Sequence, residues 1–208
     1  MAFRAFSICV FVGCAAVGAA QVTVPLDSLN LGGNPYIEVG PSLTFANVGG
    51  SGVDVSFVQN TDLRAYDLSQ YGGSAWTGPG LIGLIDMPWT TFSNPGGTDI
   101  DFSAPVSNFS LNAGDFGGDS DTPLEIQAYD SIGNLIGTAT SDWGAGVFPP
   151  FATLSVNVSG ISRIHYSSGG QFPGSTFYNE VTFTPAPEPA TVVVLGAAIL
   201  GVLRRRTR

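Results

Sequence analysis

Lysine is absent from this chain of 208 residues, and cysteine occurs only twice, at Cys9 and Cys14. Both cysteines precede a predicted cleavage site, so the mature body would contain no disulfide, thiolate nucleophile or sulfur-ligated metal. The lack of lysine excludes a lysine-based phosphate-binding loop and Schiff-base chemistry. We therefore expect the body to be stabilised by packing or by a hard cation, since about 160 residues are enough for one hydrophobic core.

Basic side chains are also scarce. Residues 21–184 carry fifteen of the sixteen acidic side chains but only two arginines, Arg64 and Arg163, which leaves a net charge of −13. Binding of DNA or RNA needs a basic surface that displaces counterions, so nucleic acid is excluded as a partner of this body. The carboxylates either keep an exported protein soluble or, at some positions, bind calcium.

The first twenty residues have the order of features found in a secretory signal. Arg4 supplies a positive charge, Ala5–Val12 is apolar, and small residues lead to Ala20. This order predicts a signal helix in residues 1–20, which signal peptidase removes between Ala20 and Gln21. Two alternatives remain open: lipidation of Cys14 at a loose lipobox, and burial of the segment as an N-terminal helix.

Residues 21–184 alternate between short apolar-polar runs and turn residues. In Val53–Phe57 three apolar side chains alternate with two polar ones, as a half-buried strand requires, and Leu154–Val158 repeats the pattern. Asp130–Asn134 separates two such runs and is typical of a hairpin turn. No stretch of ten residues has a sustained helical period. The pattern predicts an all-β domain, an antiparallel β-sandwich of the jelly-roll type.

The last predicted strand, Phe177–Phe183, ends this body. Side chains alternate between the two faces of a strand. Alternation predicts that the two phenylalanines and Val181 face the core, while Tyr178, Glu180 and Thr182 face solvent.

Residues 185–208 combine three features in a fixed order. The residues that carry them are Pro187, Glu188, Pro189 and Ala190, then the apolar run Thr191–Leu203, then Arg204, Arg205, Arg206 and Arg208. The run is shorter than the roughly 20 residues of a usual membrane-spanning helix, but arginines after an apolar segment stay on the cytoplasmic side. We expect a short transmembrane helix here; an interfacial segment and a buried C-terminal helix are the alternatives.

This tail resembles the PEP-CTERM sorting signal. The resemblance implies export across the inner membrane of a Gram-negative bacterium, transient anchoring there, and processing near the Pro-Glu-Pro motif by an exosortase. Proteins with such tails are commonly linked to extracellular polysaccharide, surface layers or biofilm. The body is also similar to β-sandwich domains that precede such tails, in Phe109–Asp119, Leu124–Thr138 and Ser167–Phe183. The tail is a substrate of processing, so the resemblance implies no catalytic residue.

Three carboxylates, Asp115, Asp119 and Asp121, lie within seven residues on a glycine-rich turn. Calcium binds six to eight oxygens, and glycine lets backbone carbonyls join the carboxylates as ligands, which makes the turn a candidate calcium site. An ordinary solvated turn has the same composition. Asp99 and Asp101 project from one face of a predicted strand and are a weaker candidate for a functional site.

Aromatic residues offer candidate contacts to sugars. Trp76 and Trp143 lie in glycine-rich loops, where their rings could stack on a glycan or simply fill the structure. Tyr178 would join them if it is exposed. His165 is the only histidine, but no Gly-x-Ser-x-Gly motif accompanies it, so we expect no catalysis through it.

These features predict a non-enzymatic exported protein of the cell surface or extracellular matrix, whose sandwich is structural or associates with glycans. The expected partners are signal peptidase, an exosortase, the inner membrane during transit, and extracellular polysaccharide. No cofactor is expected apart from calcium. The alternative is a small calcium-dependent hydrolase of polysaccharide, since glycoside cleavage needs only two carboxylates.

Overall fold

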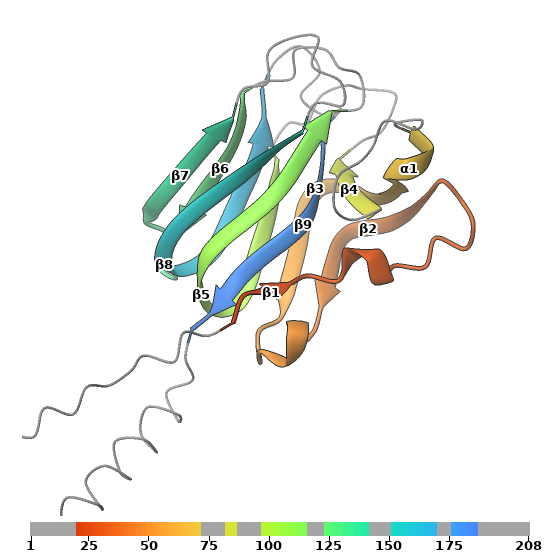
Figure 1. Cartoon of the computed structure of the whole chain (residues 1–208). Helices are drawn as coiled ribbons and strands as arrows, with labels where there is room; N and C mark the ends of the chain where they lie inside the picture. The colour runs from red at the N-terminus through yellow and green to blue at the C-terminus, as the bar shows by residue number, and fades with distance from the viewer. Residues whose placement is uncertain are drawn as a thin grey trace, which may run out of the picture.

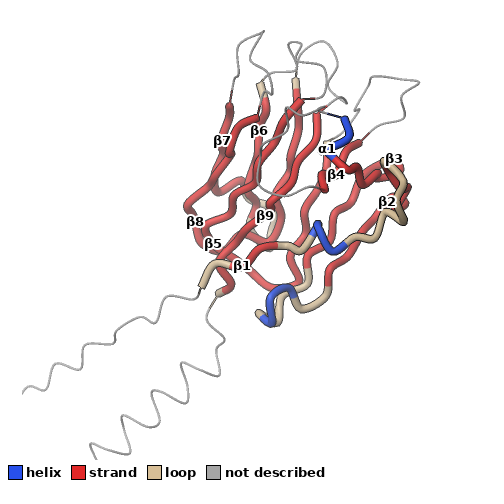
Figure 2. The backbone as a smooth tube through the Cα atoms, turned by 45° about the vertical axis from the view of Figure 1, so that its right-hand side comes forward, coloured by secondary structure: helices blue, strands red, loops and turns tan. Residues whose placement is uncertain are grey.

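The computed structural model describes residues 20–71, 82–86, 97–115, 123–141, 151–169 and 176–186. Within these ranges it contains nine strands and three short helical turns (Figures 1 and 2). The elements are β1 (Val22–Thr23), η1 (Leu26–Ser28), β2 (Tyr36–Phe45), η2 (Val48–Gly50), β3 (Val55–Asp67), α1 (Leu68–Tyr71), β4 (Ile82–Asp86), β5 (Thr98–Asp115), β6 (Leu124–Tyr129), β7 (Leu135–Ser141), β8 (Phe151–Ser168) and β9 (Thr176–Pro185). Every strand pair is antiparallel, which confirms the all-β prediction.

The strands form one hydrogen-bonded network that is folded into two layers. In the first layer, here called the His165 sheet, the order is β2-β3-β5-β8-β6-β7. In the second, the β9 sheet, the order is β8-β5-β9-β4-β3-β2, and β1 pairs with the lower part of β9. Figure 1 shows the resulting sandwich, with β1 and the end of β9 together at its lower end.

Four strands belong to both layers. The first part of β5, Thr98–Asp101, pairs with β3 and β8 in the His165 sheet, and its second part, Val106–Asp115, pairs with β9 and β8 in the β9 sheet. Strand β8 follows β5 around the same bend. On the other side of the sandwich, β3 pairs with β5 through Val55–Val58 and with β4 through Leu63–Asp67, so β2 and β3 also cross between the layers.

The bend of β5 and β8 has a local cause. The register between the two strands breaks after Asp101, shifts twice more between Val106 and Phe109, and is regular again from Phe109. Pro105 lies in the first break, where its missing N–H interrupts no regular pair. Asn108 and Gly160 both have positive φ, 50° and 84°, close to the point where Ser107 pairs with Ser159. Positive φ at these positions turns both chains over from one layer to the other.

Aromatic side chains join the two layers. Phe57 of the His165 sheet stacks on Tyr178 of the β9 sheet, with 5.9 Å between the ring centroids. The ring centroid of Tyr166 lies 5.1 Å from that of the same tyrosine. Phe102 contacts Phe183 across the layers at 5.3 Å. All five side chains are buried. The predicted inward positions Val53, Val55 and Phe57 are confirmed, as are Leu154 and Val156.

Strands β6 and β7 form the predicted hairpin. The Asp130 carboxylate accepts hydrogen bonds from the backbone N–H groups of Ile132 and Asn134 at 3.0 and 2.9 Å, and from the Asn134 side-chain amide at 2.9 Å. Gly133 has φ +86°, which a residue with a side chain rarely adopts. The hydrogen bonds from Asn134 in particular hold the pKa of Asp130 below its ordinary value.

The predicted orientation of Tyr178 is wrong. Its side chain is 1% exposed and packs in the core. The cause is a β-bulge: between Thr182 and Asn179 the chain of β9 advances three residues while β5 advances two, and Glu180 has φ +48°. The extra residue shifts the alternation, so Tyr178 faces the core and is not a surface contact for glycan.

Three predicted features lie outside the described residues: residues 1–19 of the signal helix, the Pro-Glu-Pro motif and the C-terminal apolar segment. Ala20 and Gln21, which flank the predicted cleavage site, are described and exposed, and the Gln21 amide donates to the Thr182 hydroxyl at 2.7 Å. In the described ranges we find no helix with the length and apolar character needed to cross a bilayer.

The contact between layers predicts a large difference between two neighbouring residues. Phe57→Ala should lower the free energy of unfolding by about 3–5 kcal/mol, because it removes a fully buried ring from the interface of the sheets. Val58→Ala, on the opposite face and 38% exposed, should cost less than about 1 kcal/mol. Urea unfolding of both variants gives the comparison, and equal losses would contradict the assignment of these faces.

Candidate functional site

The outer surface of the His165 sheet carries a group of polar side chains from three adjacent strands. Each strand alternates buried and half-buried residues, so its polar side chains point away from the core. We call this surface the polar face; its residues are Asp99 and Asp101 of β5, Arg163 and His165 of β8, and Glu125, Gln127 and Tyr129 of β6.

The strand register places these side chains in two rows. Asp99 is paired with His165, and His165 with Gln127. In the next row Asp101 is paired with Arg163, and Arg163 with Tyr129. Neighbouring strands lie about 4.8 Å apart, so the side chains of one row are in reach of one another.

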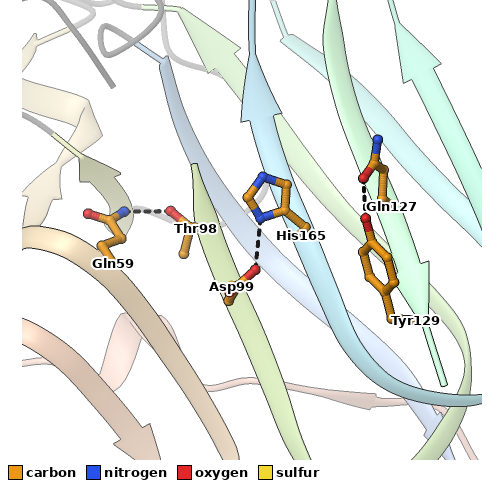
Figure 3. Close-up of polar contacts among 6 residues, drawn as sticks. All are labelled: Gln59, Thr98, Asp99, Gln127, Tyr129 and His165. Carbon is orange, nitrogen blue, oxygen red and sulfur yellow. Dashed lines mark hydrogen bonds and ion pairs between the residues drawn. The ribbon is translucent and has the colours of Figure 1, made fainter. Parts of the chain in front are cut away.

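The centre of the first row is a hydrogen-bonded pair. His165 Nδ1 lies 2.7 Å from Asp99 Oδ1, and the two side chains are 28% and 37% exposed (Figure 3). Gly97 fits against the ring: a Cβ there would lie 2.9 Å from His165 Nε2 and 2.3 Å from the Tyr166 carbonyl oxygen, at φ +71°. The backbone before β5 therefore fixes the position of the imidazole.

The second row is organised around Arg163. Its guanidinium carbon lies 4.6 Å from the centre of the Tyr129 ring, a cation–π contact. The Tyr129 hydroxyl donates to Gln127 Oε1 (Figure 3). The Gln127 amide in turn donates to Glu125 Oε1 at 2.7 Å. Among described side chains, no hydrogen-bond partner is found for Arg163 Nε. The residues of β6 are thus oriented by one another, while Arg163 Nε is itself shielded from solvent.

The surroundings of Asp101 change the ionisation of its carboxyl group. Partial burial, and then the neighbouring Asp99 carboxylate, raise the pKa of Asp101 above its ordinary value, and Arg163 acts in the opposite direction. Just beside this face, Gln59 donates to Thr98 at 2.5 Å, but both of these side chains are buried on the core side of their strands (Figure 3). The functional candidates are therefore the residues that alternate with Thr98 and Ile100.

The outer surface of the β9 sheet is polar in a different way. Thr153 donates to Asn112 Oδ1 at 2.6 Å, the Asn112 amide donates to Glu180 at 2.5 Å, and Ser110 and Thr182 share a hydrogen bond of 2.7 Å. These groups satisfy one another across the strands. We assign them a structural role, and they supply control positions for the polar face.

Most of the other predicted site residues lie outside the described part of the chain. Asp115 ends β5, but its side chain, together with Asp119 and Asp121, lies outside the described residues, as do Trp76 and Trp143. Likewise outside are Pro187, Glu188, Pro189, Ala190, Arg204, Arg205 and Arg206. Among described side chains, no three of the types His, Cys, Asp and Glu are grouped so that they could hold a metal ion.

The sequence indicated parts of the polar face but not its assembly. Asp99 and Asp101 were predicted to share a face, and His165 to lie opposite Ile164 and Tyr166, and both predictions are confirmed. Arg163 and the β6 residues were missed because their importance depends on the pairing of strands far apart in the sequence. The available signal was alternation, with polar residues at every second position of all three strands.

Comparison with known proteins gives a remote structural likeness only. No family model and no curated protein matches the chain. A DUF4465 family protein from Bacteroides caccae aligns with a TM-score of 0.41 and 8% identity over 85% of this chain and 97% of its own. The catalytic domain of a GH87 alpha-1,3-glucanase aligns with a TM-score of 0.36 and 13% identity, over 83% of this chain but only 29% of its own. A family 6 carbohydrate-binding module from Clostridium cellulolyticum, in complex with xylose, aligns with a TM-score of 0.29 and 16% identity, over 80% of this chain and 97% of its own. Similarity of this degree assigns neither an activity nor a ligand.

The raised pKa of Asp101 predicts that ionisation of this group opposes folding. A carboxyl group with a higher pKa in the folded state destabilises the fold at pH values above that pKa, and the penalty disappears as the pH falls toward the unfolded value. Asp101→Asn should therefore raise the urea midpoint at pH 7, and the difference from the native protein should vanish near about pH 3.

Asp130 supplies the control of opposite sign. Its pKa is lowered in the folded protein, so its ionised form stabilises the fold above the unfolded pKa, and that contribution is lost as the pH falls through the folded value. Asp130→Asn should lower the midpoint at pH 7. A loss of stability in both variants at pH 7 would show that the attraction between Asp101 and Arg163 outweighs burial and repulsion from Asp99.

Proposed function

We propose that this protein is exported to the cell surface or extracellular matrix and that its polar face binds glycan without catalysis. The observation that supports the binding role is the joined arrangement of Arg163, Tyr129 and the Asp99–His165 pair on one open sheet surface. Sugars present hydroxyl groups that both donate and accept hydrogen bonds, together with apolar ring faces. Carboxylate, imidazole, amide and guanidinium groups that are already oriented match such a ligand.

Preorganisation favours this role over a merely solvated surface. Binding costs less when the side chains that contact the ligand are already ordered. Asp99 and His165 hold each other, and Gln127 is held from both sides by Tyr129 and Glu125. The absence of lysine and the net charge of −13 in residues 21–184 also favour a neutral polyhydroxylated ligand over a polyanion.

The destination is proposed from the two ends of the chain. The order of charge, apolar run and small residues before Gln21 supports cleavage by signal peptidase. The Pro187–Ala190 motif, the apolar run and the arginine cluster support sorting as a PEP-CTERM protein by an exosortase, with transient residence in the inner membrane of a Gram-negative bacterium. We also propose a jelly-roll arrangement of the sandwich and calcium binding at Asp115, Asp119 and Asp121, the latter supported by the sequence alone.

One observation favours a second function, hydrolysis of polysaccharide. Asp99 and Asp101 lie two residues apart on the same strand face, which separates their Cα atoms by about 6.6 Å. Glycoside hydrolases use two neighbouring carboxyl groups, one of them with a raised pKa as proton donor. Asp101 has the raised pKa, so it would protonate the leaving oxygen as the glycosidic bond breaks, while Asp99 takes a proton from the water that adds to the anomeric carbon.

Binding through the polar face predicts a sharp contrast between variants. Arg163→Gln and Asp99→Asn should each weaken adsorption to a matrix polysaccharide by about tenfold or more, because each removes a charge-assisted hydrogen bond. Thr182→Ala, on the outer surface of the β9 sheet, should leave adsorption unchanged. Depletion assays on a panel of extracellular polysaccharides give the comparison, with release of reducing ends measured on the same samples.

The outcomes separate the two functions. Adsorption without new reducing ends supports binding, whereas reducing ends that disappear in Asp101→Asn support hydrolysis. Equal adsorption by the native protein and all three variants would refute a role for the polar face.

Sorting is tested by following the tail. In a host with its exosortase, the mature mass should lack residues beyond about Pro189, and the body should reach the cell surface. In the same host without the exosortase, the arginines should be retained and the protein should stay in the inner membrane. Retention of the tail in both hosts would mean that the segment is an ordinary anchor.

A further inference from the structure

The two lateral edges of the His165 sheet differ in how they are protected. At one edge, β2 contains Pro41, has register irregularities on both sides of Gly40, and carries the Glu38–Arg64 ion pair at 2.8 Å. Proline, bulges and charged side chains are the means by which proteins prevent an exposed strand from pairing with another chain. Strand β2 is therefore a blocked edge.

The opposite edge, β7, is less protected: it has a single register irregularity, between Gly137 and Leu135. Its residues Leu135–Ser141 include no proline and no charged side chain, and within the described part of the chain β7 pairs only with β6. Leu135 is 53% exposed, and Ile132 in the adjoining turn is 82% exposed. Strand β7 thus presents an open row of backbone donors and acceptors beside exposed apolar groups.

The layer behind β7 is uncharged as well. Residues 151–162 of β8 contain no ionisable side chain, and Val158 lies against Gly137, where an added Cβ would be 3.4 Å away. A body with a net charge of −13 repels a second copy of itself over most of its surface. Residues 135–141 and 151–162 therefore offer a surface on which two copies can meet without a charged side chain in either segment; Asp130 lies in the turn beyond the end of β7.

We propose that two copies of the chain pair through β7, antiparallel about a two-fold axis at Thr138. In this register Thr138 faces its own copy and Gly137 faces Ala139; the irregularity between Gly137 and Leu135 lies beyond these central pairs. A Thr–Thr pair is favourable in antiparallel sheets, and the small residues beside it allow close approach. No protected strand, such as β2, offers an equivalent partner.

The proposed dimer has a consequence for the polar face, although it does not depend on glycan binding. A two-fold axis perpendicular to the sheet joins the two His165 sheets edge to edge and keeps both polar faces on the same side. Thr138 is paired with Gln127, so the contact lies next to that face. Two sites on one continuous surface would bind a repeating polymer with higher avidity than either site alone.

Disulfide formation tests the register directly. Opposed residues of an antiparallel pair have Cα atoms about 4.5–5.5 Å apart, which a disulfide can span. In the full chain with Cys9→Ser and Cys14→Ser, Thr138→Cys should give a disulfide-linked dimer under mild oxidation. Ser42→Cys on the β2 edge should give none, and Ala139→Cys, which does not face its own copy, should give much less. No dimer from Thr138→Cys, or equal amounts from all three, overturns the proposal.

Mass measurement of the full chain in a mild detergent supplies the second test. Light scattering should show a concentration-dependent dimer, and Thr138→Asp should weaken it by about tenfold, because two carboxylates would then face each other. Thr138 is exposed, so the change should not disturb folding, and Ser42→Asp is the matched control. A monomer at every concentration, or association that Thr138→Asp does not alter, contradicts pairing through β7.

Discussion

The ladder between β5 and β8, which runs on both sides of their common bend, is the constraint on which the rest of the structure depends. Both strands pair along their length and bend over together, so each supplies a strand to the His165 sheet and another to the β9 sheet. The bend brings the inner surfaces of the layers together, where Phe57, Tyr166 and Tyr178 meet. Breaking this ladder would disrupt the centre of both sheets at once. In a sandwich whose sheets share no strands, the same break would disrupt only one sheet.

The same ladder creates the polar face. Asp99 and His165 are 66 residues apart in sequence, and they meet because the register of β5 and β8 places them opposite each other. Arg163 is placed next to Asp101 in the same way, and β6 adds Tyr129 beneath the guanidinium. In an acidic body with two arginines and one histidine, the concentration of Arg163 and His165 on one face is what distinguishes it from the rest of the surface.

Sequence alternation predicted the local structure wherever the strand pairing is regular. Val55 and Phe57 face the core as the pattern requires, and the Asp130 turn forms its hairpin because its carboxylate binds the turn's own N–H groups. Alternation failed at Tyr178, because the bulge at Glu180, which has positive φ, changes which face of β9 the side chains before it occupy. No glycine or proline in this strand segment indicates the bulge. The polar face was only partly predictable, since alternation gives the direction of a side chain but not its neighbours on other strands.

The most direct test of glycan binding at the polar face uses His165, the only histidine of the chain. Its imidazole gives a single set of ring resonances in solution NMR, and it lies between Asp99 and Gln127 at the centre of the face. Titration with a matrix polysaccharide that adsorbs the protein should shift the His165 ring signals together with the amides of β5, β6 and β8. Shifts confined to the β9 sheet or to the loops, with the His165 signals unchanged at saturation, would contradict the account.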